Sequence, residues 1–287
     1  MTSKDTAILL AHCPDAKGII YAVTDFVLSN NGNIVELDEH VDRDESHFFM
    51  RMEWELSDFA IPTEKIAEFF ETLIARKFNM QWDLHIASQK PRVALFVSKY
   101  PHCLYDILSR YDSGELKIEI PLIISNHEKF RDLAERFNIP FHHFPITREN
   151  KAEQEKKEIE LLKAHDIDFV VLARYMQILS ARMTEAFPMK IINIHHSSLP
   201  AFAGANPYKA AYMRGVKFMG ATAHYVTEEL DEGPIIAQDV CPITHRDSIS
   251  DMKRKGRDIE KIVLAKAIWS HINHNVMVYK NRTIIFE

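Results

Sequence analysis

Residues 168–196 contain the two runs of sequence that decide the fold of this chain, DFVVLA at 168–173 and KIINIHH at 190–196. Both runs are short and rich in valine, isoleucine and leucine, which is typical of parallel strands that are buried on both faces. Two similar runs precede them, PRVALFVS at 91–98 and IEIPLIIS at 118–125. Helical stretches or turns separate the four runs. The chain from residue 91 onward is therefore predicted to form a doubly wound α/β domain.

The segments between these strands indicate helices and one unusual loop. The expected helices are HCLYDILSRY at 102–111, HEKFRDLAERFN at 127–138 and RENKAEQEKKEIELLKAH at 148–165. In doubly wound sheets a ligand binds beyond the carboxyl ends of the strands. The loop after the first strand, SKYPH at 98–102, contains no glycine, unlike the glycine-rich loops that bring backbone amides close to phosphates. The sequence thus argues against a nucleotide phosphate at this position.

The first ninety residues follow a different pattern, which predicts a small βαββαβ domain. Strands are expected at 6–13, 33–42, 46–56 and 80–88, and amphipathic helices at 18–32 and 62–79. The polar segment ASQKP at 87–91 ends in proline and is the best candidate for a linker. We therefore expect two domains, 1–88 and 91–287.

Composition and charge restrict the class of protein. The 287 residues are 46% apolar and 26% charged, as in soluble globular proteins, and the net charge of −6 argues against a nucleic-acid partner. No apolar stretch approaches the roughly 18 residues that a membrane helix needs. The three cysteines are odd in number and show no CxxC spacing, which fits reduced thiols, and no metal-ligand motif such as HExxH is present. We expect a soluble cytoplasmic protein without a membrane partner and without a metal.

The strand at 190–196 ends in polar side chains that suggest a reaction centre. Asn193 and His195 alternate with Ile192 and Ile194, so both point to the same side of an extended chain. An amide can donate to a carbonyl oxygen that becomes negatively charged, and an imidazole can carry a proton at neutral pH. The alternative is that Asn193 binds neighbouring backbone while the histidines only end the strand.

A second polar segment, GATAHYVTEELDEGPIIAQ at 220–238, offers a carboxylate. A predicted strand at 221–226 leads into an acidic loop that Gly233 and Pro234 terminate. Asp231 in this loop either faces a pocket beside the strand or belongs to a solvated acidic loop. The residues alone leave both readings open.

Taken together, the two segments resemble the folate-dependent formyltransferase and deformylase superfamily. NIHHSSLP at 193–200 has that family's Asn-x-His element followed by a Ser-x-x-Pro loop, and LDEGP at 230–234 matches its LDxGP turn. The resemblance implies a Rossmann-like formyltransferase domain in which Asn193, His195 and Asp231 act on the formyl group of a reduced folate. It assigns supporting roles to His196 and His224. It implies no cofactor beyond the substrate, 10-formyltetrahydrofolate, and assigns folate binding to Tyr175, Met176, Gln177, Ile178, Leu179, Thr227 and Glu229.

The formyl acceptor in this superfamily is an amine of glycinamide ribonucleotide, methionyl-tRNA or water. The glycine-free loop at 98–102 differs from the phosphate loop of ribonucleotide transferases, and the acidic charge is unlike that of tRNA enzymes. The paired His195 and His196 and the segment at 244–268 resemble the formyltetrahydrofolate deformylases. This likeness implies hydrolysis to tetrahydrofolate and formate, which supplies formate for purine synthesis and balances the one-carbon folate pool. The alternatives are transfer to an amine such as glycinamide ribonucleotide, or a non-catalytic ligand sensor.

The N-terminal ninety residues resemble an ACT domain, a small-molecule sensing module, in their CPDAKGII turn at 13–20 and their element order. An ACT domain joined to a formyltransferase-like domain is the arrangement of the deformylases. The resemblance implies a homo-oligomer, dimer or tetramer, and an amino-acid effector such as glycine or methionine. The expected effector residues are Asp15, Lys17, Gly18, Asn31 and Asn33. The alternative is that this domain serves only oligomerisation.

Overall fold

The computed structural model describes residues 5–200 and 207–286, which divide into two compact units. The first unit contains the chain up to Lys90 together with two C-terminal segments, Asn273–Met277 and the residues from Ile284. The second unit contains Pro91–Ile272 and Val278–Thr283. The chain thus returns to the first unit after the last long helix. Within the described residues, no helix combines the length and the apolar character that a bilayer crossing requires.

The first unit is a four-stranded antiparallel sheet with strand order β2-β3-β1-β4. Its strands are β1 (Thr6–Pro14), β2 (Asn33–Asp42), β3 (His47–Glu55) and β4 (Gln81–Ile86). Its helices are α1 (Ile19–Leu28) and α2 (Thr63–Phe70), the latter continued by a π turn, η1 (Glu71–Ala75), and by α3 (Arg76–Phe78). The predicted βαββαβ order is confirmed. Alternation explains the core, because Leu9, Met52 and Trp54 bury one face of the sheet beneath Val23 and Phe70 of the helices.

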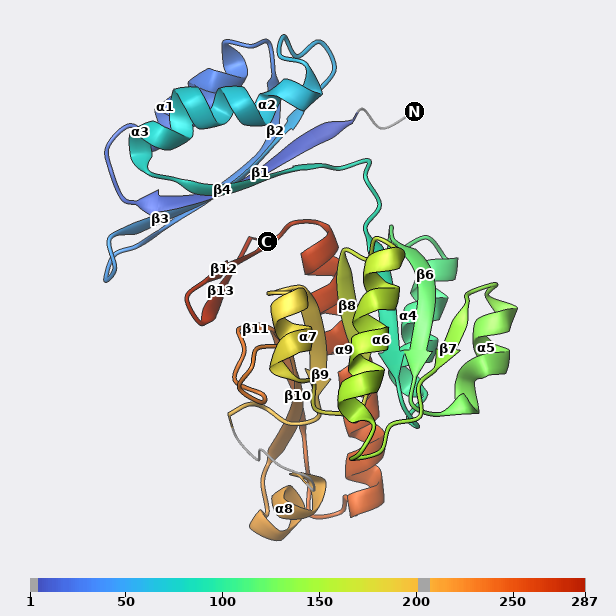
Figure 1. The fold of residues 1–287 in the computed structure, drawn as a ribbon. Coiled ribbons are helices and arrows are strands. Elements are labelled where there is room, and N and C mark those ends of the chain that lie inside the picture. Colours follow the sequence, from blue (N-terminus) through green and yellow to red (C-terminus); the bar gives the residue numbers. More distant parts are fainter. Residues whose placement is uncertain (1–4, 201–206, 287) are drawn as a thin grey trace. The chain divides into compact units, whose positions relative to one another are not determined.

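The second unit is built on a seven-stranded sheet with order β11-β10-β9-β8-β5-β6-β7 (Figure 1). Its strands are β5 (Arg92–Val97), β6 (Glu119–Ser125), β7 (Phe141–His143), β8 (Phe169–Ala173), β9 (Ile191–His195), β10 (Phe218–Tyr225) and β11 (Ile235–Pro242). The five strands from β9 to β7 run parallel, whereas β10 and β11 are antiparallel to their neighbours. The expected doubly wound α/β domain is confirmed as a mixed sheet. The antiparallel direction of β10 is an addition that the sequence did not indicate.

Helices cover both faces of this sheet. They are α4 (His102–Asp112), η2 (Glu128–Phe130), α5 (Arg131–Arg136), α6 (Lys151–Ala164), α7 (Ala181–Ala186), α8 (Pro207–Arg214) and α9 (Ile249–Ile272). The helices α4 and α9 pack against each other on one face, and α6 and α7 lie on the other (Figure 1). The parallel strands bury both their faces, since every residue of β8 is buried. A short hairpin, β12 (Val276–Tyr279) and β13 (Arg282–Ile285), follows α9.

Candidate functional site

The site begins at the end of β9, where Asn193 and His195 lie on the same side of the strand. The antiparallel strand β10 places His224 directly opposite Asn193, and Thr222 opposite His195. Directly opposed residues share a face of the sheet, so all four polar side chains point the same way. The other face of β10 turns toward α9, where Tyr225 Oη lies 2.8 Å from His271 Nδ1. The register of the β9–β10 pair therefore brings these four polar side chains together.

Asn193 and His224 form a hydrogen bond whose direction can be assigned. His224 Nδ1 lies 2.9 Å from the carbonyl oxygen of Tyr225, which can only accept, so Nδ1 carries the proton. In the neutral ring Nε2 is then an acceptor, and Asn193 Nδ2 donates to it over 3.2 Å. His224 thus fixes the Asn193 carboxamide with its NH₂ group on the side of the imidazoles. The second amide hydrogen is left to donate elsewhere.

Asp231 reaches this group from the loop between β10 and β11. Its carboxylate Oδ2 lies 3.1 Å from His195 Nδ1, and its Oδ1 lies 3.6 Å from His224 Nε2. The hydrogen bond from His195 holds the pKa of Asp231 well below its usual value, so the carboxylate is charged. The turn depends on Gly233, because a Cβ there would meet the carbonyl oxygen of Tyr225 at 1.8 Å.

The contact with Asp231 leaves one of the two ring nitrogens of His195 available. His195 is buried, with an exposed fraction of 7%, and its Nδ1 faces Asp231. Its Nε2 has no hydrogen-bond partner within the described part of the chain. A carboxylate behind Nδ1 favours the tautomer with the proton on that atom, as in carboxylate–histidine pairs of hydrolases. The predicted trio is thus brought together in one place, with a fixed imidazole whose second nitrogen is open.

Hydrogen bonds hold the loop after His195, and they come from residues that the sequence did not identify as candidates. Thr222 Oγ1 accepts from the amide of Leu199 over 3.0 Å and donates to the carbonyl of Ser197 over 2.9 Å. Gln238 Nε2 of β11 donates to the carbonyl of Leu199 over 3.0 Å. A signal was present, since Thr222 is a polar residue within an apolar strand, but its partner strand was not predictable.

His196 lies between His195 and α8. Its ring centroid is 5.3 Å from that of His195 and 5.7 Å from that of Tyr208. Burial, and then the charge of Arg174, lower the pKa of His196 to about 4. His196 is therefore neutral near pH 7.

The predicted folate-binding residues divide into two groups. The exposed fractions of Met176 and Ile178 are 50% and 58%, whereas Tyr175 is buried in the core at 5%. The Tyr175 ring packs edge-on against Phe96, so it supports the segment from below and does not line an open surface. Gln177 and Leu179 are partly exposed.

The other predicted folate-binding residues, Thr227 and Glu229, lie in the loop that carries Asp231. Thr227 Oγ1 donates to the carbonyl of Glu229 over 3.2 Å, which shapes the beginning of this loop. Glu229 is exposed and Thr227 is partly exposed. Both residues therefore belong to the loop that carries the carboxylate.

The predicted effector residues all belong to the first unit and are exposed. Asp15, Lys17 and Gly18 precede α1, and Asn31 and Asn33 follow it. A helix of ten residues is about 15 Å long, so the two groups lie at opposite ends of α1 within one chain. A shared effector site would require a second copy of the chain.

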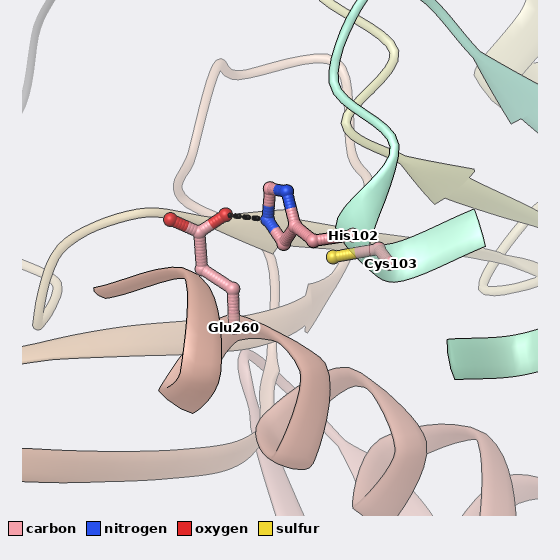
Figure 2. Close-up of side chains that lie close together, drawn as sticks. All are labelled: His102, Cys103 and Glu260. Carbon is pink, nitrogen blue, oxygen red and sulfur yellow. Dashed lines mark hydrogen bonds and ion pairs between the residues drawn. The ribbon is translucent and has the colours of Figure 1, made fainter. Parts of the chain in front are cut away.

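A buried cluster around Glu260 of α9 includes His102 and Cys103 at the start of α4 (Figure 2). His102 Nε2 lies 2.7 Å from Glu260 Oε2, and Tyr208 Oη donates to Glu260 Oε1 over 2.8 Å. Arg174 Nε forms an ion pair with Glu260 Oε2 at 3.3 Å. Burial would raise the pKa of Glu260, but the bond from His102 and the charge of Arg174 outweigh it and lower that pKa.

This cluster resembles a metal site in composition and differs from one in its bonding. Ligand atoms of His102, Cys103 and Glu260 lie within 4.8 Å of one another. Both oxygens of Glu260 already accept hydrogen bonds, a guanidinium stands beside them, and burial raises the pKa of the Cys103 thiol. A cation here would be repelled by Arg174 and would displace existing bonds. The donor set therefore fits a buried ion-pair network that ties α9 to α4, α8 and the end of β8.

Comparison with known proteins agrees with this architecture. Residues 91–268 match the family model described as formyl transferase. The chain is 51% identical to formyltetrahydrofolate deformylase of Synechocystis sp. over 98% of both chains, and 47% identical to that of Bacillus subtilis over 99% of this chain and 95% of the relative. The crystal structure of a formyltetrahydrofolate deformylase from Pseudomonas syringae superposes with a TM-score of 0.97 at 43% identity, covering 100% of this chain and 96% of that one.

Proposed function

Because the chain belongs to the formyl transferase family, and within it to the formyltetrahydrofolate deformylases, we propose that it hydrolyses 10-formyltetrahydrofolate to tetrahydrofolate and formate. The observation that carries the proposal is the pairing of His195 with Asp231, which leaves the buried Nε2 of His195 open beside the Asn193 amide. Such a pair suits attack of water on a formyl carbon.

The proposed reaction follows from the donors and acceptors of the site. Water attacks the formyl carbon, and the formyl oxygen becomes an oxyanion that the free hydrogen of the Asn193 amide and protonated His195 stabilise. One well-placed donor to an oxyanion is typically worth about 3–4 kcal/mol. The attacking water passes a proton to the Asp231 carboxylate, and this proton reaches the folate nitrogen as the C–N bond breaks. The products are tetrahydrofolate and formic acid, which loses its own proton to become formate. Asp231 orients His195 and orders the attacking water.

We further propose that the reaction needs no metal and no cofactor. The groups that would stabilise charge are all side chains of the chain itself. The test is to incubate the purified protein with 10-formyltetrahydrofolate and a chelator, without any amine, and to follow formate and tetrahydrofolate together. Equal amounts of both products are expected. If the chelator abolishes the formation of formate, the reaction is not metal-free. If the protein binds 10-formyltetrahydrofolate without forming formate, the acceptor is an amine.

The folate-binding residues are proposed as a surface next to this centre. Met176, Gln177, Ile178 and Leu179 follow β8, whose neighbour in the sheet is β9. Met176 and Ile178 expose apolar side chains that suit a flat ring system. Thr227 and Glu229 border the site from the Asp231 loop. Tyr175 contributes by supporting the segment, since its own ring is buried.

A homo-oligomer is proposed from the surface of the first unit. Large apolar side chains are exposed there on α1, on the edge strand β2 and on α2 with η1: Ile20, Tyr21, Leu28, Val35, Leu37, Phe69 and Leu73. Exposed apolar surface of this kind is typical of contacts with another protein. An edge strand with unpaired backbone groups can also extend its sheet into a second copy.

The effector and the location are further proposals. We propose that glycine or methionine binds between two copies of the first unit, where Asp15–Gly18 of one copy faces Asn31–Asn33 of another. Calorimetric titration of the full chain with each amino acid tests this, and no heat with either would favour a purely structural role. We propose a cytoplasmic location because Cys13, Cys103 and Cys241 are all unpaired, as expected in a reducing compartment.

A further inference from the structure

The segment Tyr175–Ser180, which connects β8 to α7, is irregular backbone held at both of its ends by buried carboxylates of α6. At its first residue, Tyr175 Oη donates to Glu158 Oε1 over 3.2 Å. At its last residue, the amide of Ser180 donates to Glu155 Oε1 over 3.1 Å. Glu155 and Glu158 have exposed fractions of 3% and 0%, although they belong to a run of charged residues, and such a run usually forms a solvated helix face.

Two more contacts fix the middle of the segment. Lys151, at the first turn of the same helix, donates to the carbonyl of Ile178. The amide of Met176 donates to Ser98 Oγ at the end of β5 over 3.2 Å. Four anchors over six residues leave the exposed side chains of Met176 and Ile178 on a backbone that cannot shift freely.

These buried carboxylates need an explanation beyond the stability of the fold. Burial raises the pKa of Glu158 to about 7, and its Oε2 has no hydrogen-bond partner among the residues that the structure describes. An apolar residue at this place would avoid that cost. Carboxylates are retained where directional bonds are needed, and here the bonds fix a loop that borders the reaction centre.

We infer that Glu155 and Glu158 are positioning residues, which clamp the segment Tyr175–Ser180 so that it forms a rigid wall for the ring system of the folate. This inference rests on the proposed function. Neither residue touches the reacting atoms, and Asn193, His195 and Asp231 belong to other elements, β9 and the loop after β10. Loss of the clamp therefore weakens binding of the folate and leaves the chemical step nearly unchanged.

The test measures KM and kcat for Glu155→Ala, Glu158→Met and Tyr175→Phe, with Glu160→Gln as the matched control. Glu160 lies on the same helix, and its side chain is 63% exposed. Glu155→Ala is expected to raise KM about tenfold with kcat within about twofold of wild type, because about 1.4 kcal/mol of binding is lost with the anchor. Tyr175→Phe is expected to raise KM about threefold, since the ring and its packing remain.

Binding of the product tetrahydrofolate, measured by calorimetry, separates this inference from the proposed function. If the wild type neither hydrolyses nor binds folate, the proposed function fails. If the wild type does both, and the variants have the same KM and product affinity as Glu160→Gln, the inferred role of Glu155 and Glu158 is wrong. A fall in kcat with unchanged KM would also overturn it. Should Glu155→Ala fail to fold, Tyr175→Phe and Glu158→Met decide, because both remove the hydrogen bond between these two side chains and stay close to the native side-chain volume.

Discussion

At the scale of single residues, the candidate site depends on which nitrogen of each histidine is engaged. His224 uses Nδ1 for a backbone carbonyl and Nε2 for Asn193, so it orients the amide. His195 uses Nδ1 for Asp231, which leaves Nε2 open. Two chemically identical side chains thus differ in role because their neighbours differ.

Replacement of Asp231 by asparagine tests the orientation of His195. An asparagine amide can turn its NH₂ group toward Nδ1, so His195 loses the acceptor that orients it, and a neutral amide neither stabilises a charged imidazolium nor takes a proton from the attacking water. We expect kcat to fall by about 100-fold or more, the range of a lost acid–base contribution. In His195→Ala, kcat should fall by at least as large a factor.

The control for this change is Glu232→Gln, an exposed neighbour in the same loop. It should leave turnover within about twofold of wild type. Near-normal turnover in both Asp231→Asn and His195→Ala would contradict the assignment of these residues.

At the scale of elements, the antiparallel strand β10 is the decisive one. It brings Thr222 opposite His195 and His224 opposite Asn193, and its turn returns Asp231 to the same face. A register shift between Ala223 and His224 in the pairing with β11 occurs at this position. Such irregularities are common next to active sites, where they redirect a side chain.

Thr222→Val tests whether β10 holds the loop that follows His195. Valine keeps the shape but leaves the amide of Leu199 and the carbonyl of Ser197 without their partner. Each buried unsatisfied group costs about 1–3 kcal/mol, so the free energy of unfolding should fall by several kcal/mol and turnover should decrease. Thr222→Ser keeps the hydroxyl and should have nearly native stability and turnover. Denaturant unfolding measures the stability, and initial rates measure the turnover. A stable, fully active valine variant would exclude this role.

Glu158→Gln makes the stability of the protein less dependent on pH. The pKa of Glu158 is raised from 4.5 to about 7, so the folded state binds its proton more tightly than the unfolded state. The free energy of unfolding therefore decreases as pH rises from about 4.5 to 7, and the contribution of Glu158 is fully lost above pH 7. Glutamine is neutral, so the variant should match wild type near pH 5 and exceed it by up to about 3 kcal/mol at pH 8. Equal melting temperatures for both proteins at pH 8 would contradict the raised pKa.

Glu260→Gln tests the network that joins α9 to α4 and α8. The change leaves the buried Arg174 guanidinium without its counter-charge, and loss of one partner of a buried pair costs about 3–5 kcal/mol. Unfolding in urea should show this loss, whereas Asp258→Asn, an exposed change on the same helix, should cost less than about 1 kcal/mol. A small effect from Glu260→Gln would mean that the network is not a stabilising one.

At the scale of the whole molecule, the chain consists of two units with different chemistry. The second unit carries every group of the candidate reaction centre, and the first carries the apolar side chains of the proposed oligomer contact and the proposed effector residues. Asn273–Met277 and the residues from Ile284 belong to the first unit, so the chain passes back and forth between the two units after Ile272.

The double variant Tyr21→Glu with Leu28→Glu tests the oligomer. The exposed fractions of these side chains are 73% and 60%, so the charges are tolerated in a monomer but disrupt an apolar contact between copies. Sedimentation should show a smaller species than the wild type. Met213→Glu, equally exposed but in the second unit, is expected to leave the size unchanged. If the double variant sediments like the wild type, the contact lies elsewhere.

The sequence by itself determined the element order and the parallel part of the second sheet. Local periodicity and apolar runs specify strands such as 168–173 and 190–196, because burial on both faces demands an unbroken apolar run. The same local information identified Asn193, His195 and Asp231 as candidates, since polar residues at the end of such a strand conflict with its burial. The resemblance of two short motifs to a known family then assigned their chemistry.

Only the tertiary structure decided how these candidates meet. The antiparallel direction of β10, the pairing of His224 with Asn193 and the return of Asp231 to His195 are long-range contacts that leave no periodic signal in the sequence. The same is true of Thr222, Glu158 and Glu260, which read as an ordinary strand residue and two members of charged helices. Burial turns a polar side chain into a specific partner, and burial is a property of the packed chain and not of any local segment.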